Sequence, residues 1–118
     1  MPNKTNVLWV DPENMDVWSK AFQLLNTTHA ISITPHLTRD AGEILKKARG
    51  KQVVIIHWGT NGDIDDLRSL LEKLTTQQPK TRIGLVTCCK HQLVEQFVDF
   101  YVCIVDSEEL ARLIKEGA

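Results

Sequence analysis

Short apolar runs alternate along this chain with stretches in which apolar residues recur at helical spacing. A continuous apolar run is typical of a strand buried on both faces, so the alternation indicates βαβ units around a parallel sheet. Four of the five runs are rich in β-branched residues, which favour strands. The predicted strands are 6–10, 30–34, 52–57, 82–87 and 101–105.

Between the runs, apolar side chains fall on single helical faces, which predicts helices packed on the sheet. A short fourth helix is predicted near 91–99, and a fifth is predicted to begin at a cap formed by Asp106 or Ser107. Gly50, Pro79 and Gly117 mark helix ends. The apolar stripes are Trp18, Ala21, Phe22 and Leu25; Ala41, Ile44, Leu45 and Ala48; Ile64, Leu67, Leu70, Leu71 and Leu74; and Leu110, Leu113 and Ile114.

Five right-handed units can wind into a parallel sheet of strand order 2-1-3-4-5 with helices on both faces. The predicted fold class is therefore α/β, a flavodoxin-like three-layer sandwich. No internal repeat or linker divides the sequence, so we expect one domain over 1–118. In this topology any site is expected in the crevice at the carboxyl ends of strands 1 and 3.

Composition excludes several classes of protein. No apolar run approaches the roughly 20 residues of a membrane helix, and the polar N-terminus lacks a signal peptide core, so a cytoplasmic protein is expected. The 14 basic residues are scattered against 15 acidic ones, which argues against nucleic-acid binding. With no secretion signal, the 3 cysteines are interpreted as reduced thiols.

The residues after the first and third strands have two interpretations each. Asp11 and Glu13 could hold Mg²⁺ as a carboxylate pair, but Asp11 followed by proline is also typical of a helix N-cap. The loop 59–63, which contains Asn61, lacks the spacing of a phosphate-binding loop. His57 could meet Cys88 or Cys89 in a soft metal site, although the spacing is not a zinc pattern.

The remaining candidate residues do not indicate an enzyme. Cys89 has neighbouring cations that would favour a thiolate, but no downstream arginine follows as in an anion-binding loop, and no nucleophile and base pair is found. We therefore expect no catalysis, cofactor or resident metal. Trp9, Trp18 and Trp58 are interpreted as packing groups, with Trp58 the one nearest the crevice and most readily assigned to a partner.

The ordered set of segments resembles a response-regulator receiver domain over almost the whole chain. Val7 to Asp11 resembles the first strand and leading acid, and Ala41 to Leu45 the second-helix motif. Gln52 to Trp58 resembles the phosphoacceptor strand, and Arg82 to Thr87 the strand ending in the switch threonine. Residues 63–74 resemble the third helix, and 99–110 align without a gap to the segment with the conserved aromatic, lysine and proline.

Position by position, this resemblance implies a pocket that has lost its chemistry. The receiver's phosphoacceptor aspartate falls on His57, its lysine on Cys103 and its proline on Ile104. One acid of the metal pair corresponds to Asp11, with Pro12 beside it and Glu13 as a substitute. Thr87 keeps the switch hydroxyl and Phe100 the aromatic, while about six residues are missing before Asp99, so the fourth helix should be short. Aspartyl phosphorylation needs the carboxylate, Mg²⁺ and the cation.

The sequence thus predicts an atypical receiver, or pseudo-receiver, that signals by protein contact without aspartyl phosphorylation. The resemblance implies a signalling partner such as a histidine kinase or an output domain, contacted through the fourth helix, fifth strand and fifth helix; a homodimer is a further option. The alternative is a small-ligand or metal sensor that uses the crevice. Residues considered for partner or ligand contacts are Trp58, Asn61, Cys89, His91 and Phe100.

Overall fold

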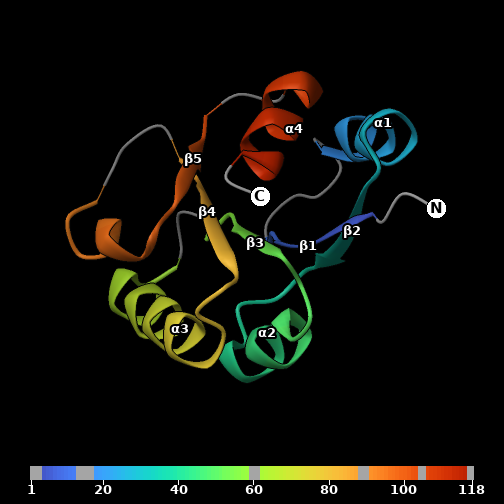
Figure 1. The fold of residues 1–118 in the computed structure, drawn as a ribbon. Coiled ribbons are helices and arrows are strands. Elements are labelled where there is room, and N and C mark those ends of the chain that lie inside the picture. The colour runs from blue at the N-terminus through green and yellow to red at the C-terminus, as the bar shows by residue number, and fades with distance from the viewer. Residues whose placement is uncertain (1–3, 13–17, 59–61, 88–90, 104–105, 117–118) are drawn as a thin grey trace.

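The computed structural model is described over residues 4–12, 18–58, 62–87, 91–103 and 106–116. Its centre is a parallel sheet of order β2-β1-β3-β4-β5, as predicted (Figure 1). The strands are β1 (Thr5–Val10), β2 (Ile31–His36), β3 (Val53–Ile56), β4 (Arg82–Val86) and β5 (Phe100–Val102), and the helices are α1 (Ser19–His29), α2 (Ala41–Ala48), α3 (Ile64–Gln77) and α4 (Ser107–Lys115), with a 3-10 turn η2 (Glu95–Phe97).

Helices α2 and α3 cover one face of the sheet, and α1 and α4 cover the other (Figure 1). The central strands β1 and β3 send alternate side chains into two separate apolar clusters, which is why their sequences are apolar throughout. On the α1 side, Trp9 packs its ring against Trp18 at 4.7 Å and Phe22 at 4.9 Å between centroids. The packing role predicted for Trp9 and Trp18 is confirmed.

Aspartates begin three of the helices. Asp40, Asp63 and Asp106 each accept hydrogen bonds from backbone N–H groups of the first helical turn, which otherwise have no partner within the helix. The predicted cap at Asp106 is therefore confirmed. Gly50 follows the end of α2 with φ +78°, a conformation that favours glycine.

The ends of several elements differ from the predictions. Helix α1 begins at Ser19, well beyond Asp11, so Asp11 is not its N-cap. Strand β2 continues through Pro35 to His36; because β2 is an edge strand, a residue without an N–H is tolerated there. The predicted fourth helix is represented by a turn and the short η2, since the shortened segment leaves no room for several helical turns.

The β4 and β5 strands approach each other closely at Gly84. A Cβ atom at this position would lie 2.4 Å from the Phe100 ring, so only glycine leaves space for the aromatic side chain. Nearby, the Arg82 guanidinium lies 5.0 Å from the centroid of that ring and donates hydrogen bonds to the Leu113 and Ile114 carbonyls. Within the described ranges, no helix is long and apolar enough to cross a membrane.

Candidate functional site: the crevice at the strand ends

The carboxyl ends of four adjacent strands carry the residues of the predicted crevice. Backbone hydrogen bonds continue one residue beyond the strands: the His57 N–H donates to Val10 O at 2.7 Å, and the Thr87 N–H donates to Val102 O at 3.0 Å. Strand order therefore puts His57 between Asp11 and Thr87, with Cys103 next to Thr87 at the β5 end. These four residues thus lie at neighbouring strand ends along one edge of the sheet.

Asp11 and His57 form an ion pair at the centre of this edge. Asp11 Oδ1 lies 3.2 Å from His57 Nδ1, without hydrogen-bond alignment. The carboxylate is 0 % exposed and the imidazole 32 %. A buried carboxylate is costly unless partners compensate its charge, and the imidazole, when it is protonated, supplies one such partner. The acid that resembles a receiver's magnesium ligand thus faces an imidazole.

Cys103 occupies the end of β5, where the receiver resemblance implies a lysine. The residue is exposed and disulfide-bonded. The interpretation of the cysteines as reduced thiols is therefore wrong for Cys103, because a count of cysteines cannot reveal which sulfur atoms the fold brings together. A disulfide sulfur carries no positive charge, so Cys103 cannot replace the cation of a phosphorylation site.

The aromatic candidates are both largely buried. Trp58 is 7 % exposed and its indole N–H donates to Asp63 O at 2.8 Å, while Arg39 Nε donates to Trp58 O at 2.6 Å. Trp58 also fills the space beside Gly62, where a Cβ atom would lie 2.3 Å from the indole. These contacts confirm a packing role for Trp58. Phe100 is 7 % exposed as well, so a partner contact at either ring stays a prediction.

The other predicted contacts divide into two groups. His91 is exposed, and its Nδ1 accepts a hydrogen bond from the Leu93 N–H at 3.2 Å. Glu13, Asn61 and Cys89 lie outside the described residues.

His36 is a residue of this edge that the sequence did not single out. It ends β2 and is 6 % exposed, and its Nε2 lies 3.0 Å from Thr38 Oγ1. Burial, and then the positive charge of Lys47, lower the pKa of the imidazole below its usual value. The signal that could have found it is the apolar and β-branched run leading up to it, which continues the strand past Thr34.

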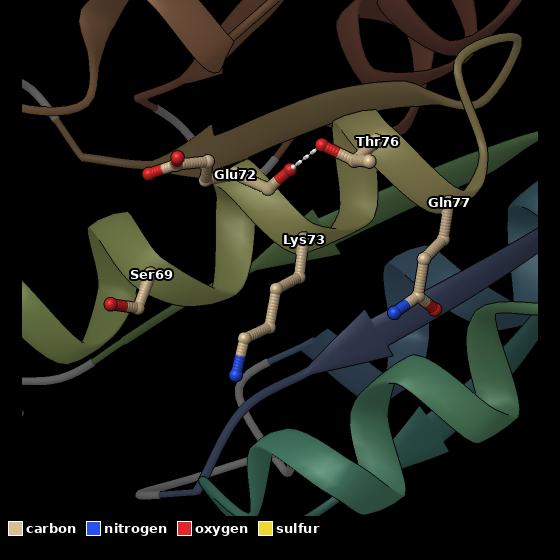
Figure 2. A pocket seen from close by; sticks show the side chains of 5 residues that line it. All are labelled: Ser69, Glu72, Lys73, Thr76 and Gln77. Carbon is tan, nitrogen blue, oxygen red and sulfur yellow. Dashed lines mark hydrogen bonds between the residues drawn. The ribbon is translucent and has the colours of Figure 1, made fainter.

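A second hollow lies away from the crevice, on α3. It encloses about 340 Å³ and is lined by Ser69, Glu72, Lys73, Thr76 and Gln77 (Figure 2). Lys73 and Gln77 point toward α2, and Thr76 Oγ1 donates to the Glu72 carbonyl at 2.9 Å. This lining is polar and exposed, unlike the mostly apolar concave sites that bind small molecules. Among the described residues, no group of three His, Cys, Asp or Glu side chains is arranged to hold a metal.

No family model matches the chain, and no curated protein matches it in sequence. Solved structures do match. A CheY-like receiver domain from Methanospirillum hungatei JF-1 superposes with a TM-score of 0.73 at 20% identity, covering 97% of this chain and 93% of that one. An orphan response regulator of H. pylori gives 0.71 at 14% identity over 97% of each chain. The chain has the receiver fold.

A third receiver-fold match comes from the complex of histidine kinase ThkA with the response regulator TrrA. It has a TM-score of 0.71 at 19% identity, covering 95% of this chain and 97% of that one. All three matches span nearly the full length of this chain. The fold class and the resemblance predicted from sequence are confirmed.

Proposed function

We propose that this chain is a pseudo-receiver that acts in signal transduction by binding another protein, without aspartyl phosphorylation. The observation that carries the proposal is the Asp11–His57 ion pair, with an imidazole at the position of the receiver's phosphoacceptor. Transfer to a receiver needs a carboxylate nucleophile, Mg²⁺ and a cation. Asp11 pairs with His57, and Cys103 is disulfide-bonded, so two of these parts are missing from the proposed site.

The proposed contact surface is the one over residues 91–103 and α4, called the output face below. Its support is the receiver fold together with an exposed apolar side chain, Leu93, which is 41 % exposed in the turn before η2. Charged side chains of α4, Glu109 and Arg112, form an exposed ion pair on the same side of the sheet as α1. An exposed apolar side chain with charged side chains elsewhere on the surface fits a protein partner. One receiver-fold match comes from a complex with a histidine kinase, which makes a kinase a candidate partner class.

The decisive test exposes the purified chain to acetyl phosphate and Mg²⁺, and separately to beryllofluoride and Mg²⁺. We expect no phosphoryl adduct by intact mass and no widespread change in the NMR amide shifts, because the crevice lacks the receiver's carboxylate. A receiver domain with its aspartate, treated in parallel, should give both responses.

His57→Ala is the matched control for chemistry at the imidazole. A stoichiometric adduct that His57→Ala retains and that hydroxylamine removes would indicate an acyl phosphate on a carboxylate and would contradict the proposal. An adduct present in the wild-type chain and missing from His57→Ala would indicate phosphorylation of the imidazole, and would replace the proposed mechanism by a different one.

A further inference from the structure

One hollow at the amino edge of the sheet is lined, among the described residues, by two lysines and no carboxylate. It encloses about 500 Å³ between the segments that precede β3 and β4, and Lys51 and Lys80 both line it. The hollows on α3, beside Trp58 and beside His29 each include at least one aspartate or glutamate. The amino-edge hollow therefore differs from these in carrying positive charge alone. Its other lining residues are Gly50, Gln52, Gln78, Pro79 and Thr81.

The sequence on both sides of this hollow contains no acidic residue. Residues 44–52 and 73–81 include none of the 15 acidic residues of the chain and 6 of its 14 basic ones, which are Lys46, Lys47, Arg49, Lys51, Lys73 and Lys80. Lys46 and Lys47 lie in the last turn of α2, where a cation offsets the negative end of the helix dipole. Lys51 and Lys80 lie beyond the ends of α2 and α3, so that role does not account for them.

Hydrogen bonds fix the two segments relative to each other. The Thr81 hydroxyl donates to the Lys51 carbonyl at 3.0 Å, and the Arg82 N–H donates to the Gln52 carbonyl at 3.0 Å. The Lys51 N–H donates in turn to the Ala48 carbonyl at 3.1 Å. Because the backbone that carries the two lysines is already ordered, a ligand that bridges them has to order only their side chains, which lowers the entropy cost of binding.

We propose that this hollow is a second contact surface of the protein, which binds an acidic segment of a protein partner through Lys51 and Lys80. Carboxylates of such a segment complement the charge of the two ammonium groups. The surface is separate from the crevice and does not depend on the proposed function, since β3 and β4 begin at this edge and the crevice lies where they end.

Other anionic ligands fit this hollow less well. Lys80 is exposed and Lys51 only partly buried, whereas a small-molecule site encloses most of its ligand. A nucleic acid requires a broad basic surface, and this chain has a net charge of −1. A membrane is flat and does not enter a hollow. An extended acidic peptide can lie across the hollow and place its carboxylates beside both lysines.

The experiment measures binding of a fluorescein-labelled peptide of alternating glutamate and serine to the full chain by fluorescence anisotropy. The matched peptide has glutamine in place of glutamate. We expect the glutamate peptide to bind at least tenfold more tightly, because only its carboxylates can pair with Lys51 and Lys80. Raising the salt from about 0.1 M to 1 M shortens the screening length from about 10 Å to 3 Å, so it should weaken this binding.

The decisive variant combines Lys51→Gln with Lys80→Gln, and it should weaken binding of the glutamate peptide at least tenfold. Its control combines Lys20→Gln on α1 with Arg68→Gln on α3, which removes the same charge at residues that do not line the hollow, and it should change the affinity less than twofold. Thermal melts check that both chains fold. Lys80→Gln alone, at an exposed side chain, should weaken binding at least threefold and keeps the test available if the double variant does not fold.

Equal effects of the two double variants would show that binding follows net charge and would overturn the proposal, as would equal affinities for the two peptides. A DNA duplex or phosphatidylserine vesicles that bind more tightly than the peptide, and lose binding in the Lys51 and Lys80 variant, would assign the hollow to a nucleic acid or a membrane and would also overturn it. The assay uses no phosphoryl donor and no residue of the output face, so its failure can be told apart from failure of the proposed function.

Discussion

The imidazole of His57 lies next to the buried carboxylate of Asp11. A fully buried carboxylate needs positive or hydrogen-bonding partners, and in this crevice the His57 imidazole lies 3.2 Å away on the next strand. An aspartate at position 57 would bring two carboxylates together on an edge where Cys103, which is disulfide-bonded, carries no charge to offset them. The imidazole at position 57 is therefore consistent with the absence of a cation at position 103, because neither change leaves two carboxylates without a compensating charge.

The pair predicts a coupled effect on stability. His57→Ala should lower the free energy of unfolding by about 1–3 kcal/mol, because the buried carboxylate loses a partner. With Asp11→Asn already in place, the same change should cost much less, since no charge remains to be compensated. Urea unfolding of the four chains measures the coupling. His91→Ala, at an exposed histidine, should have little effect. Costs that add within about 0.5 kcal/mol would show that the two side chains are independent.

At this scale the sequence predicted which residues meet but not how they pair. Asp11, His57, Thr87 and Cys103 follow strand ends, and parallel topology brings such residues to one edge. Their pairing depends on which face each side chain takes once its strand has ended, and on contacts between residues far apart in the chain. The disulfide of Cys103 and the burial of His36 also depend on tertiary contacts, each at its own end of the sheet.

The secondary-structure features that were predicted correctly are those set by residues within one helical turn. The cap at Asp106 and the glycine after α2 act within one turn, and both are found. The predicted fourth helix is a 3-10 turn in the structure, because its apolar residues, Val94 and Phe97 among them, lie in a tight turn that packs toward α3. Apolar spacing over so few residues does not separate an α-helix from a 3-10 turn.

Arg82 connects two elements, and its contribution can be measured. It donates to the Leu113 and Ile114 carbonyls at the end of α4, which lack partners within the helix, and lies over the Phe100 ring. Arg82→Ala should lower the free energy of unfolding by about 1–3 kcal/mol.

Arg68→Ala is the control for Arg82, because Arg68 makes an exposed ion pair with Glu72 at 3.6 Å, and it should cost at most about 0.5 kcal/mol. Equal effects of the two substitutions in chemical denaturation would contradict the capping role of Arg82.

Different elements lie at the two ends of the sheet (Figure 1). Strand β2 and helix α1 form one end of the structure, while β5 and η2 form the other. The crevice lies along the carboxyl edge between them. Cys103 follows β5 and therefore lies at the end of this edge farthest from β2.

This arrangement allows a matched test of the output face. Leu93 and Leu24 are both 41 % exposed, but Leu93 precedes η2 whereas Leu24 lies on α1. We expect Leu93→Glu to weaken binding of the signalling partner at least tenfold, because an apolar contact is replaced by a charge that must be desolvated; tenfold corresponds to about 1.4 kcal/mol. Leu24→Glu should leave binding unchanged. Proteins recovered on immobilised wild-type chain are compared with those recovered on each variant, and the affinity of any protein lost on one variant is then measured directly. A partner lost with Leu24→Glu and kept with Leu93→Glu would place recognition on the α1 end and contradict the proposed face.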